Sequence, residues 1–270
     1  MIYLFSFIFS LFTTFLYTNT KRNMSGFNVW QIIIMIIIFT IVFIVLSIAI
    51  ISFFSLFVNR KKKVTTPSKF YMFLFNLLNE FAIMSMRIKL VVKNADIVNK
   101  NGKYIMVCNH VSDFDSMIIS DYFNKMPIGW LSKEPNLKIP VLGNILYKYG
   151  YFAVNRDDDK TALKQMIECI RFIKSNDISY GVFPEGTRNK SADGLLPFRS
   201  GSLKLSQKTD CPILVMSIKN TQKIHKNFPF RRTKVILDFI EVIDSSVFDS
   251  KSTVEVSEHI RQKIYDSLFN

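Results

Sequence analysis

A run of 30 residues without one charged side chain, Val29–Val58, constrains this chain of 270 residues more than any other feature. A helix needs about 20 consecutive apolar residues to cross the hydrocarbon core of a bilayer, so the run can span a membrane with tilt to spare. A buried helix of a water-soluble protein is the alternative, but such helices are rarely this long and charge-free. The run therefore predicts a transmembrane helix.

Basic residues are concentrated just after this run. The net charge of the chain is +14, and residues 60–103 hold ten lysines and arginines against two acidic residues. Positive charge usually marks the cytoplasmic end of a span, so we expect the chain after Arg60 to lie on the cytoplasmic side. The same charges attract anionic lipid. Nucleic acid would also bind them, but no nucleic-acid-binding motif is present, so membrane lipid is the predicted partner and nucleic acid is not.

Two weaker apolar stretches flank the run. Residues 1–18 lack the basic start and the cleavage site of a signal peptide, and they are a second candidate span that would make a hairpin. Translation starting at Met24 is the alternative reading of this region. Phe70–Met86 is too polar for a span, and either an interfacial helix or an ordinary core helix fits it. The predicted parts are a membrane anchor (1–63), an interfacial helix region (64–86) and a cytoplasmic globular domain (87–270).

The globular domain alternates strand and helix patterns, which predicts an α/β fold with a mixed sheet flanked by helices. The clearest helix is Lys160–Lys174, which has one apolar face and acidic residues before its first turn. A second helix is predicted over Val254–Phe269. The predicted strands are Lys89–Val92, Tyr104–Cys108, Tyr151–Val154, Ile178–Phe183, Ile213–Ile218 and Val235–Ile240.

His110 stands at the end of a predicted strand, where α/β proteins usually form their sites. Asp115 follows five residues later. If it lies in the first turn of a helix that begins after His110, its carboxylate can fold back onto the imidazole. That contact would fix the tautomer and leave the other ring nitrogen free as a general base. The alternative is a strand-end histidine with Asp113 or Asp115 as a helix cap.

Three cations are candidates for binding phosphate. Arg188 follows the predicted strand 178–183, and its planar guanidinium suits phosphate oxygens. Arg156 follows the strand 151–154 in the same manner, and Lys133 is a third candidate. A solvated surface cation is the alternative for each of them.

The counts of cysteine and histidine argue against a disulfide scaffold and a metal site. The three cysteines show no CxxC spacing, so a thiolate zinc site has no support. A metal-dependent hydrolase that used His110 and Asp115 as ligands would need further histidines, but His225 and His259 lie in unrelated, polar stretches. We therefore predict no metal.

Four sequence blocks together resemble those of the glycerolipid acyltransferase family. They are Asn-His-x4-Asp at 109–115, Gly-x5-Arg at 150–156, Phe-Pro-Glu-Gly-Thr-Arg at 183–188 and Cys-Pro-Ile-Leu at 211–214. The first block alone is a weak signal, but together with the third block it is a strong one. The resemblance covers about residues 87–220 and points to the 1-acyl-sn-glycerol-3-phosphate acyltransferases within the family.

The resemblance implies roles for individual residues. His110 matches the family's general base, and Asp115 matches the acid that orients it. Lys133 is a less securely aligned phosphate contact, and the block at 211–214 is linked with donor or structural roles. The residues that match positions binding the phosphorylated acceptor are Arg156, Glu185, Gly186, Thr187 and Arg188.

The implied reaction is transfer of a fatty acyl group to the sn-2 hydroxyl of lysophosphatidic acid, which makes phosphatidic acid. The donor would be acyl-CoA or acyl carrier protein, a co-substrate, and no resident cofactor is expected. One alternative is an acyltransferase for another lysophospholipid or for glycerol 3-phosphate. The other is a membrane-tethered protein that binds anionic lipid without catalysis, although a pure lipid binder has no need of a base.

Overall fold

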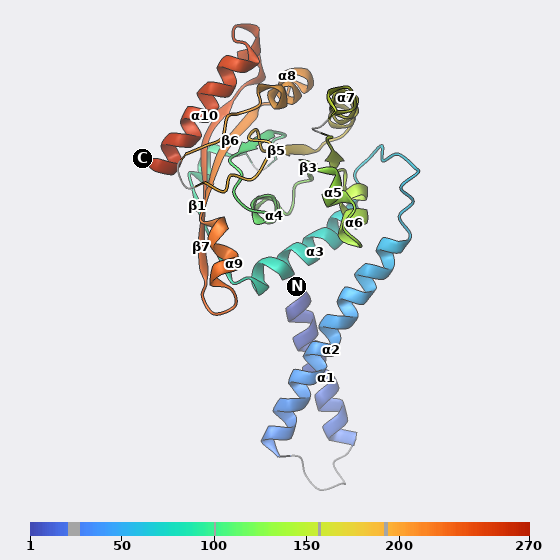
Figure 1. Ribbon diagram of the computed structural model, residues 1–270. Coiled ribbons are helices and arrows are strands. Elements are labelled where there is room, and N and C mark those ends of the chain that lie inside the picture. The colour runs from blue at the N-terminus through green and yellow to red at the C-terminus, as the bar shows by residue number, and fades with distance from the viewer. Residues whose placement is uncertain (21–27, 100, 156–157, 192–193) are drawn as a thin grey trace. The chain divides into compact units, whose positions relative to one another are not determined.

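The computed structural model divides the chain into two compact units, Met1–Asn59 (unit 1) and Arg60–Asn270 (unit 2). It describes residues 1–20, 28–99, 101–155, 158–191 and 194–270 (Figure 1). The anchor predicted from the sequence ends at Lys63, whereas the division between the units follows Asn59.

Unit 1 consists of two helices, α1 (Ile2–Thr20) and α2 (Val29–Leu56). Both are long and apolar enough to cross a membrane. Asn28 begins α2 with a capping box, because its side chain accepts from the main-chain N–H of Gln31 while the Gln31 side chain accepts from that of Asn28. Large apolar side chains are exposed along both helices, which is the arrangement expected of segments surrounded by lipid.

Small polar residues mark the side on which α1 packs against α2. Ser6, Ser10 and Thr14 are spaced four residues apart, so they share one face of α1, and all three are buried. The Thr40 hydroxyl of α2 donates to the Ser10 hydroxyl at 2.9 Å. Small side chains let two helices approach closely in lipid, where hydrophobic burial does not drive association. The second candidate span therefore packs as a helix on the first.

We expect the full chain to stay in the membrane fraction during an alkaline carbonate wash, because the apolar sides of α2 would otherwise face water. The measurement is the distribution of the protein between pellet and supernatant, with a peripheral membrane protein as the control. Release into the supernatant would overturn the transmembrane interpretation of α2.

Unit 2 is built on one sheet of seven strands. Its order is β1-β7-β6-β2-β5-β3-β4, and every neighbouring pair is parallel except β6 and β7. The predicted mixed sheet is thus confirmed. The strands are β1 (Ile88–Lys93), β2 (Ile105–Cys108), β3 (Ile128–Ser132), β4 (Phe152–Ala153), β5 (Ser179–Val182), β6 (Ile213–Lys219) and β7 (Thr233–Ile243).

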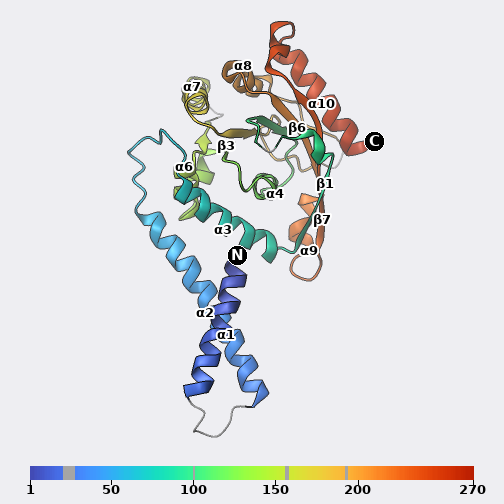
Figure 2. The same ribbon diagram turned by 180° about the vertical axis from the view of Figure 1, so that it is seen from behind.

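Helices cover both faces of the sheet. On one face, alternate residues of β2, β5 and β6 form a core with α7, α8 and α10, in which Ile105, Tyr180 and Ile213 are fully buried. On the other face α4 packs on the sheet, since Phe123 at the end of α4 contacts Phe239 of β7. The helix α3 packs on α4. The helices are α3 (Lys69–Ser85), α4 (Phe114–Tyr122), α5 (Glu134–Leu137), α6 (Leu142–Tyr149), α7 (Asp159–Ser175), α8 (Lys204–Thr209), α9 (Ile224–Asn227) and α10 (Thr253–Phe269). Figure 2 shows the same layers from behind.

Candidate active site

The centre of the sheet contains a topological switch point. From β2 the chain runs through α4 to β3 on one side, whereas from β5 it runs through α8 to β6 on the other side. Connections that leave in opposite directions open a crevice at the carboxyl ends of adjacent strands, where ligands of open α/β sheets bind. His110 follows β2, and the 183–188 block follows β5. Topology therefore brings the first and third sequence blocks together.

His110 and Asp115 form the contact that their spacing suggested. The Nδ1 atom of His110 lies 2.9 Å from Oδ2 of Asp115, which is in the first turn of α4 and fully buried. The same oxygen accepts from the main-chain N–H groups of Val111 and Ser112, at 2.7 and 2.8 Å. These two main-chain bonds hold the Asp115 carboxylate in position independently of its contact with the imidazole. His110 keeps 19% of its side chain exposed, so Nε2 is available to a substrate.

The main chain of His110 is held from the neighbouring strand. Its N–H donates to Oε1 of Glu185 at 2.7 Å, and its carbonyl oxygen accepts from the N–H of Asn189 at 2.7 Å. The other Glu185 oxygen accepts from the N–H of Leu196 at 3.1 Å. Burial raises the pKa of the Glu185 carboxyl, and these two main-chain donors oppose the rise. In this structure Glu185 thus supports the base, and its contact with an acceptor stays a prediction.

A stack of three rings sets the plane of the imidazole. The His110 ring lies on Phe183, with centroids 4.1 Å apart and planes at 10°. Phe183 lies on Trp130 of β3, at 4.8 Å and 19°. The Trp130 indole donates to the Ser120 hydroxyl of α4 at 3.0 Å. Gly181 makes room for this stack, because a Cβ there would lie 2.4 Å from Cε3 of Trp130.

Gly181→Ala should therefore impair both stability and catalysis. The added methyl group must push Trp130 aside, and such overpacking costs about 1–3 kcal/mol, or a fall in melting temperature of about 2–12 °C. We expect kcat to fall while KM for the acceptor changes little, because the displaced stack carries His110. Gly201→Ala is the matched control, since a Cβ at Gly201 meets nothing within 4 Å. Equal behaviour of the two variants would contradict the role of the stack.

The third block places its arginine beside the dyad. Gly186 has a φ of 72°, which the turn after Pro184 requires and which glycine adopts without strain. Thr187 and Arg188 are exposed at the mouth of the crevice. The Nη1 group of Arg188 donates to the carboxylate of Asp113, the residue that begins α4. A guanidinium has five N–H donors, so this pair leaves others for a phosphate.

Lys133 and Arg156 complete the predicted set of cations. Lys133 is exposed and follows directly on β3, so it stands at the same edge of the sheet as His110. The strands β3 and β2 are separated by β5 alone, which corresponds to about 10 Å between their ends. Arg156 lies outside the residues that the structure describes.

Three other residues that the sequence analysis considered, Pro212, His225 and Cys108, are not part of the dyad. Pro212 is next to the start of β6, and its carbonyl oxygen accepts from Ile105 N–H at the amino end of β2, so the fourth block stands at the opposite edge. The sequence predicted a polar setting for His225, but its ring packs on Phe114 with centroids 5.2 Å apart.

Burial, with the nearby Asp115 and Glu185, raises the pKa of the Cys108 thiol well above its usual value. Cys108 is thus an inert core residue.

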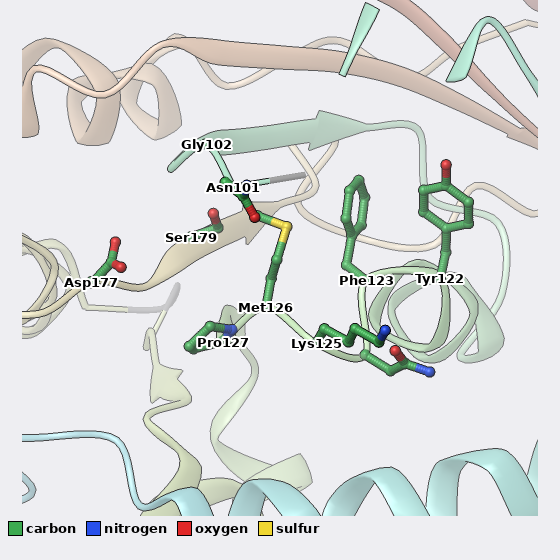
Figure 3. Close-up of a pocket in the computed structure, with 10 residues that line it drawn as sticks. Asn101, Gly102, Tyr122, Phe123, Lys125, Met126, Pro127, Asp177 and Ser179 are labelled. Carbon is green, nitrogen blue, oxygen red and sulfur yellow. The ribbon is translucent and has the colours of Figure 1, made fainter. Parts of the chain in front are cut away.

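A pocket of about 450 Å³ also lies at the opposite edge (Figure 3). Asn101 and Gly102 precede β2, Met126 and Pro127 precede β3, and Asp177 precedes β5. These segments meet at the amino ends of the parallel strands. The pocket is therefore separate from the crevice that holds His110.

Asn109 shapes the crevice, although the sequence block that contains it assigned it no role. Asn109 is buried, and its side-chain amide donates to the carbonyl oxygen of Ile218 at 3.0 Å while its Oδ1 accepts from Ile218 N–H at 2.8 Å. The amide thereby extends the pairing of β2 with β6 up to His110. The first sequence block includes Asn109, but the block does not show that its side chain pairs with Ile218.

Comparisons with known proteins show that this chain is similar to acyltransferases. A model of the Acyltransferase family matches residues 89–219. The chain is 28% identical to a 1-acyl-sn-glycerol-3-phosphate acyltransferase of Borreliella burgdorferi, over 67% of this chain and 72% of that protein. It is 28% identical to the Escherichia coli protein of that name over 59% and 64%, and 27% identical to the Saccharomyces cerevisiae one over 70% and 63%.

A solved structure shares the fold. The crystal structure of the 1-acyl-sn-glycerophosphate acyltransferase from Thermotoga maritima has a TM-score of 0.60 to this chain. The two are 24% identical, and the match covers 82% of this chain and 86% of the other.

Proposed function

From the premise that this chain is an enzyme with an acyltransferase domain over residues 89–219, we propose that it acylates the sn-2 hydroxyl of lysophosphatidic acid. The product would be phosphatidic acid, and the donor a fatty acyl thioester of coenzyme A or of acyl carrier protein. The observation that carries the proposal is the His110–Asp115 dyad beside Arg188, because it joins a general base to a cation suited to phosphate. The names of the relatives point to the same acceptor.

The reaction begins with proton transfer to Nε2 of His110 from the acceptor hydroxyl. The oxygen attacks the thioester carbonyl carbon, and a tetrahedral oxyanion forms. Its collapse expels the thiolate, which takes the proton back from the imidazolium. Asp115 stabilises the imidazolium through Nδ1 and keeps the ring in the required orientation. No acyl-enzyme is needed, since the acceptor brings its own nucleophile, and the route uses no resident metal or cofactor.

Membrane attachment suits these substrates. Lysophosphatidic acid, its product and the acyl chain all partition into a bilayer, and α1 and α2 are able to span one. The basic run Arg60–Lys63 follows α2 closely, which favours a catalytic unit on the cytoplasmic side.

A transfer assay tests the proposal. Membranes containing the protein are incubated with a panel of acceptors (lysophosphatidic acid, lysophosphatidylglycerol, lysophosphatidylethanolamine and glycerol 3-phosphate), each with acyl-CoA and with acyl carrier protein as donor. Phosphatidic acid should be the main product. Preference for another lysolipid would show that lysophosphatidic acid is not the acceptor. Binding of anionic lipid without turnover on any donor and acceptor pair would favour the non-catalytic alternative.

Arg188→Ala should raise KM for lysophosphatidic acid by about tenfold or more and leave the KM of the donor nearly unchanged. The loss of a charge-assisted contact to phosphate costs about 1.5–3 kcal/mol. Arg188→Lys should restore affinity only in part, because an ammonium group lacks the planar fork. The measurement is steady-state kinetics with each substrate varied in turn.

The partner of Arg188 supplies the control for that variant. The Asp113 side chain is 66% exposed and makes no capping bond, so its loss is of little consequence for the fold. If Arg188 binds phosphate, Asp113→Ala should leave the acceptor KM unchanged or lower it. A similar rise in KM for both variants would show that the ion pair itself matters, which would contradict phosphate binding.

A further inference from the structure

The connection between β6 and β7 combines exposed aromatic side chains with strong positive charge. Residues 219–234 contain six lysines and arginines, and no acidic residue occurs between Asp210 and Asp238. Phe228 is 44% exposed and Phe230 is 86% exposed. We call residues 226–232 the basic aromatic loop; they are Lys226, Asn227, Phe228, Pro229, Phe230, Arg231 and Arg232.

The basic aromatic loop has a defined shape, so the exposure of its rings is built into the fold. Nη1 of Arg87, which lies just before β1, donates to the carbonyl oxygens of Pro229 and Phe230 at 2.9 and 3.3 Å. The Arg231 N–H donates to the carbonyl oxygen of Asn227 at 2.8 Å. The Asn227 amide donates to the Thr233 hydroxyl at the first residue of β7, at 2.9 Å. These bonds close the loop, and the side chains of Phe228, Phe230, Arg231 and Arg232 on it are exposed.

This loop emerges at the same edge of the sheet as the dyad. The strands β6 and β2 are parallel, and Asn109 is bonded to Ile218 near the end of β6. Since β7 is antiparallel to β6, it begins at that edge as well. The ring of His225 in α9 packs on Phe114, the neighbour of Asp115. The basic aromatic loop, which begins in the last turn of α9, thus borders the crevice.

A second apolar surface lies on α3. Phe70, Phe73 and Met84 are each about half exposed and fall on one side of the helix, because their spacing is close to whole turns. Asn79, on the opposite side, is buried and donates to the Met117 carbonyl oxygen of α4. In both views α3 and the basic aromatic loop lie at the same end of unit 2 (Figures 1 and 2).

We propose that the basic aromatic loop, together with the exposed side of α3, docks unit 2 onto the surface of an anionic lipid bilayer. Aromatic side chains next to basic ones are the usual composition of segments that lie in a membrane interface. The uncompensated charge is complementary to anionic headgroups, and each lysine or arginine near such a surface contributes about a fivefold gain in binding. Nucleic acid would use the charges but leave the apolar side of α3 in water.

Docking at this place has a consequence for the chemistry. Docking would hold the carboxyl ends of β2 and β5, where His110 lies, against the lipid surface. A membrane helix alone tethers a domain to the bilayer but sets no orientation. The basic aromatic loop would supply that orientation for a substrate whose acyl chain stays in the membrane.

Site-specific labelling of the full chain tests the docking without any need for turnover. The three native cysteines are buried, so Phe230→Cys offers one accessible thiol for an environment-sensitive dye. The labelled protein is reconstituted into vesicles of phosphatidylcholine with or without 30% phosphatidylglycerol, and quenching by doxyl-labelled lipid is measured. Val254→Cys is the matched control, because Val254 is also apolar and 64% exposed but lies in the first turn of α10, which follows the opposite end of β7.

With phosphatidylglycerol present, the dye at position 230 should shift to the blue and be quenched by doxyl lipid, whereas the dye at 254 should not. Adding Arg231→Ala and Arg232→Ala should lower the docking equilibrium about 25-fold. An unquenched dye at 230 would overturn the proposal, as would equal quenching at 254 or in neutral vesicles. A blue shift without quenching would indicate contact with protein, such as a second copy of the chain, and would also overturn it.

Discussion

Replacing His110 with alanine should abolish acyl transfer while the protein stays folded and still binds the acceptor. General-base catalysis contributes about 10²–10⁴-fold, and neither Asp115 nor Glu185, the two carboxylates bonded to His110 in the described part of the chain, is free to replace it. Asp115 is buried behind the imidazole, and both Glu185 oxygens accept from main-chain N–H groups. The loss should therefore appear in kcat, measured as initial rates at saturating acceptor and donor.

A histidine outside the crevice provides the control for this variant. His259 pairs with Glu241 at 3.1 Å on the exposed side of unit 2, so His259→Ala should retain nearly full activity. Retention of the melting temperature by both variants separates lost chemistry from lost structure. Substantial activity in His110→Ala would remove the proposed mechanism, whatever the acceptor proves to be.

The sequence predicted best those features that depend on residues near one another in the chain. The helix predicted over Lys160–Lys174 is α7, because one apolar face and an acidic start are local signals; the Asp158 side chain accepts from the N–H of Lys160. The contact between His110 and Asp115 was also within reach. Five residues suffice to turn a strand end into a helix start and fold the carboxylate back.

Features that depend on pairing between distant segments were missed. The strand β3 was not predicted, since Ile128–Ser132 has neither a long apolar run nor clean alternation. It is a strand because β5 and β4 pair with it on either side. Gly129 weakens a strand by propensity, but here it leaves space for the ring of Tyr180. The predicted strand Tyr151–Val154 shrinks to Phe152–Ala153 because it pairs with β3 alone at the edge.

The supports of the site were hidden for the same reason. Phe183 belongs to a quoted sequence block, but nothing in the sequence shows that its ring lies between His110 and Trp130. Trp130 is on β3, the strand that was missed. Glu185 was assigned to the acceptor by resemblance, whereas its bond to His110 N–H follows from the pairing of β2 with β5. The sequence thus indicated the reactive residues, whereas the residues that position His110 are known only from the tertiary contacts.

Asp115→Asn should reduce kcat by about 10²–10⁴-fold, and the geometry indicates why. The N–H groups of Val111 and Ser112 both point at Oδ2, so they would select the amide oxygen of asparagine for that place. The oxygen could still accept from Nδ1 of His110, and the tautomer would be kept. The amide NH2 would take the place of Oδ1, which is buried without a hydrogen-bond partner among the described residues. What disappears is the negative charge that stabilises the imidazolium.

The double variant His110→Ala/Asp115→Asn distinguishes a dyad from two separate contributions. If Asp115 acts only through the ring, removing it from an enzyme that already lacks His110 should cost nothing further in kcat. If the two residues act independently, the fold-reduction in kcat of the double variant should equal the product of the two single reductions. Melting temperatures of all three variants are the control, because the buried NH2 group of asparagine lowers stability on its own account. A multiplicative loss at equal melting temperatures would remove the dyad and leave His110 as a base without an orienting acid.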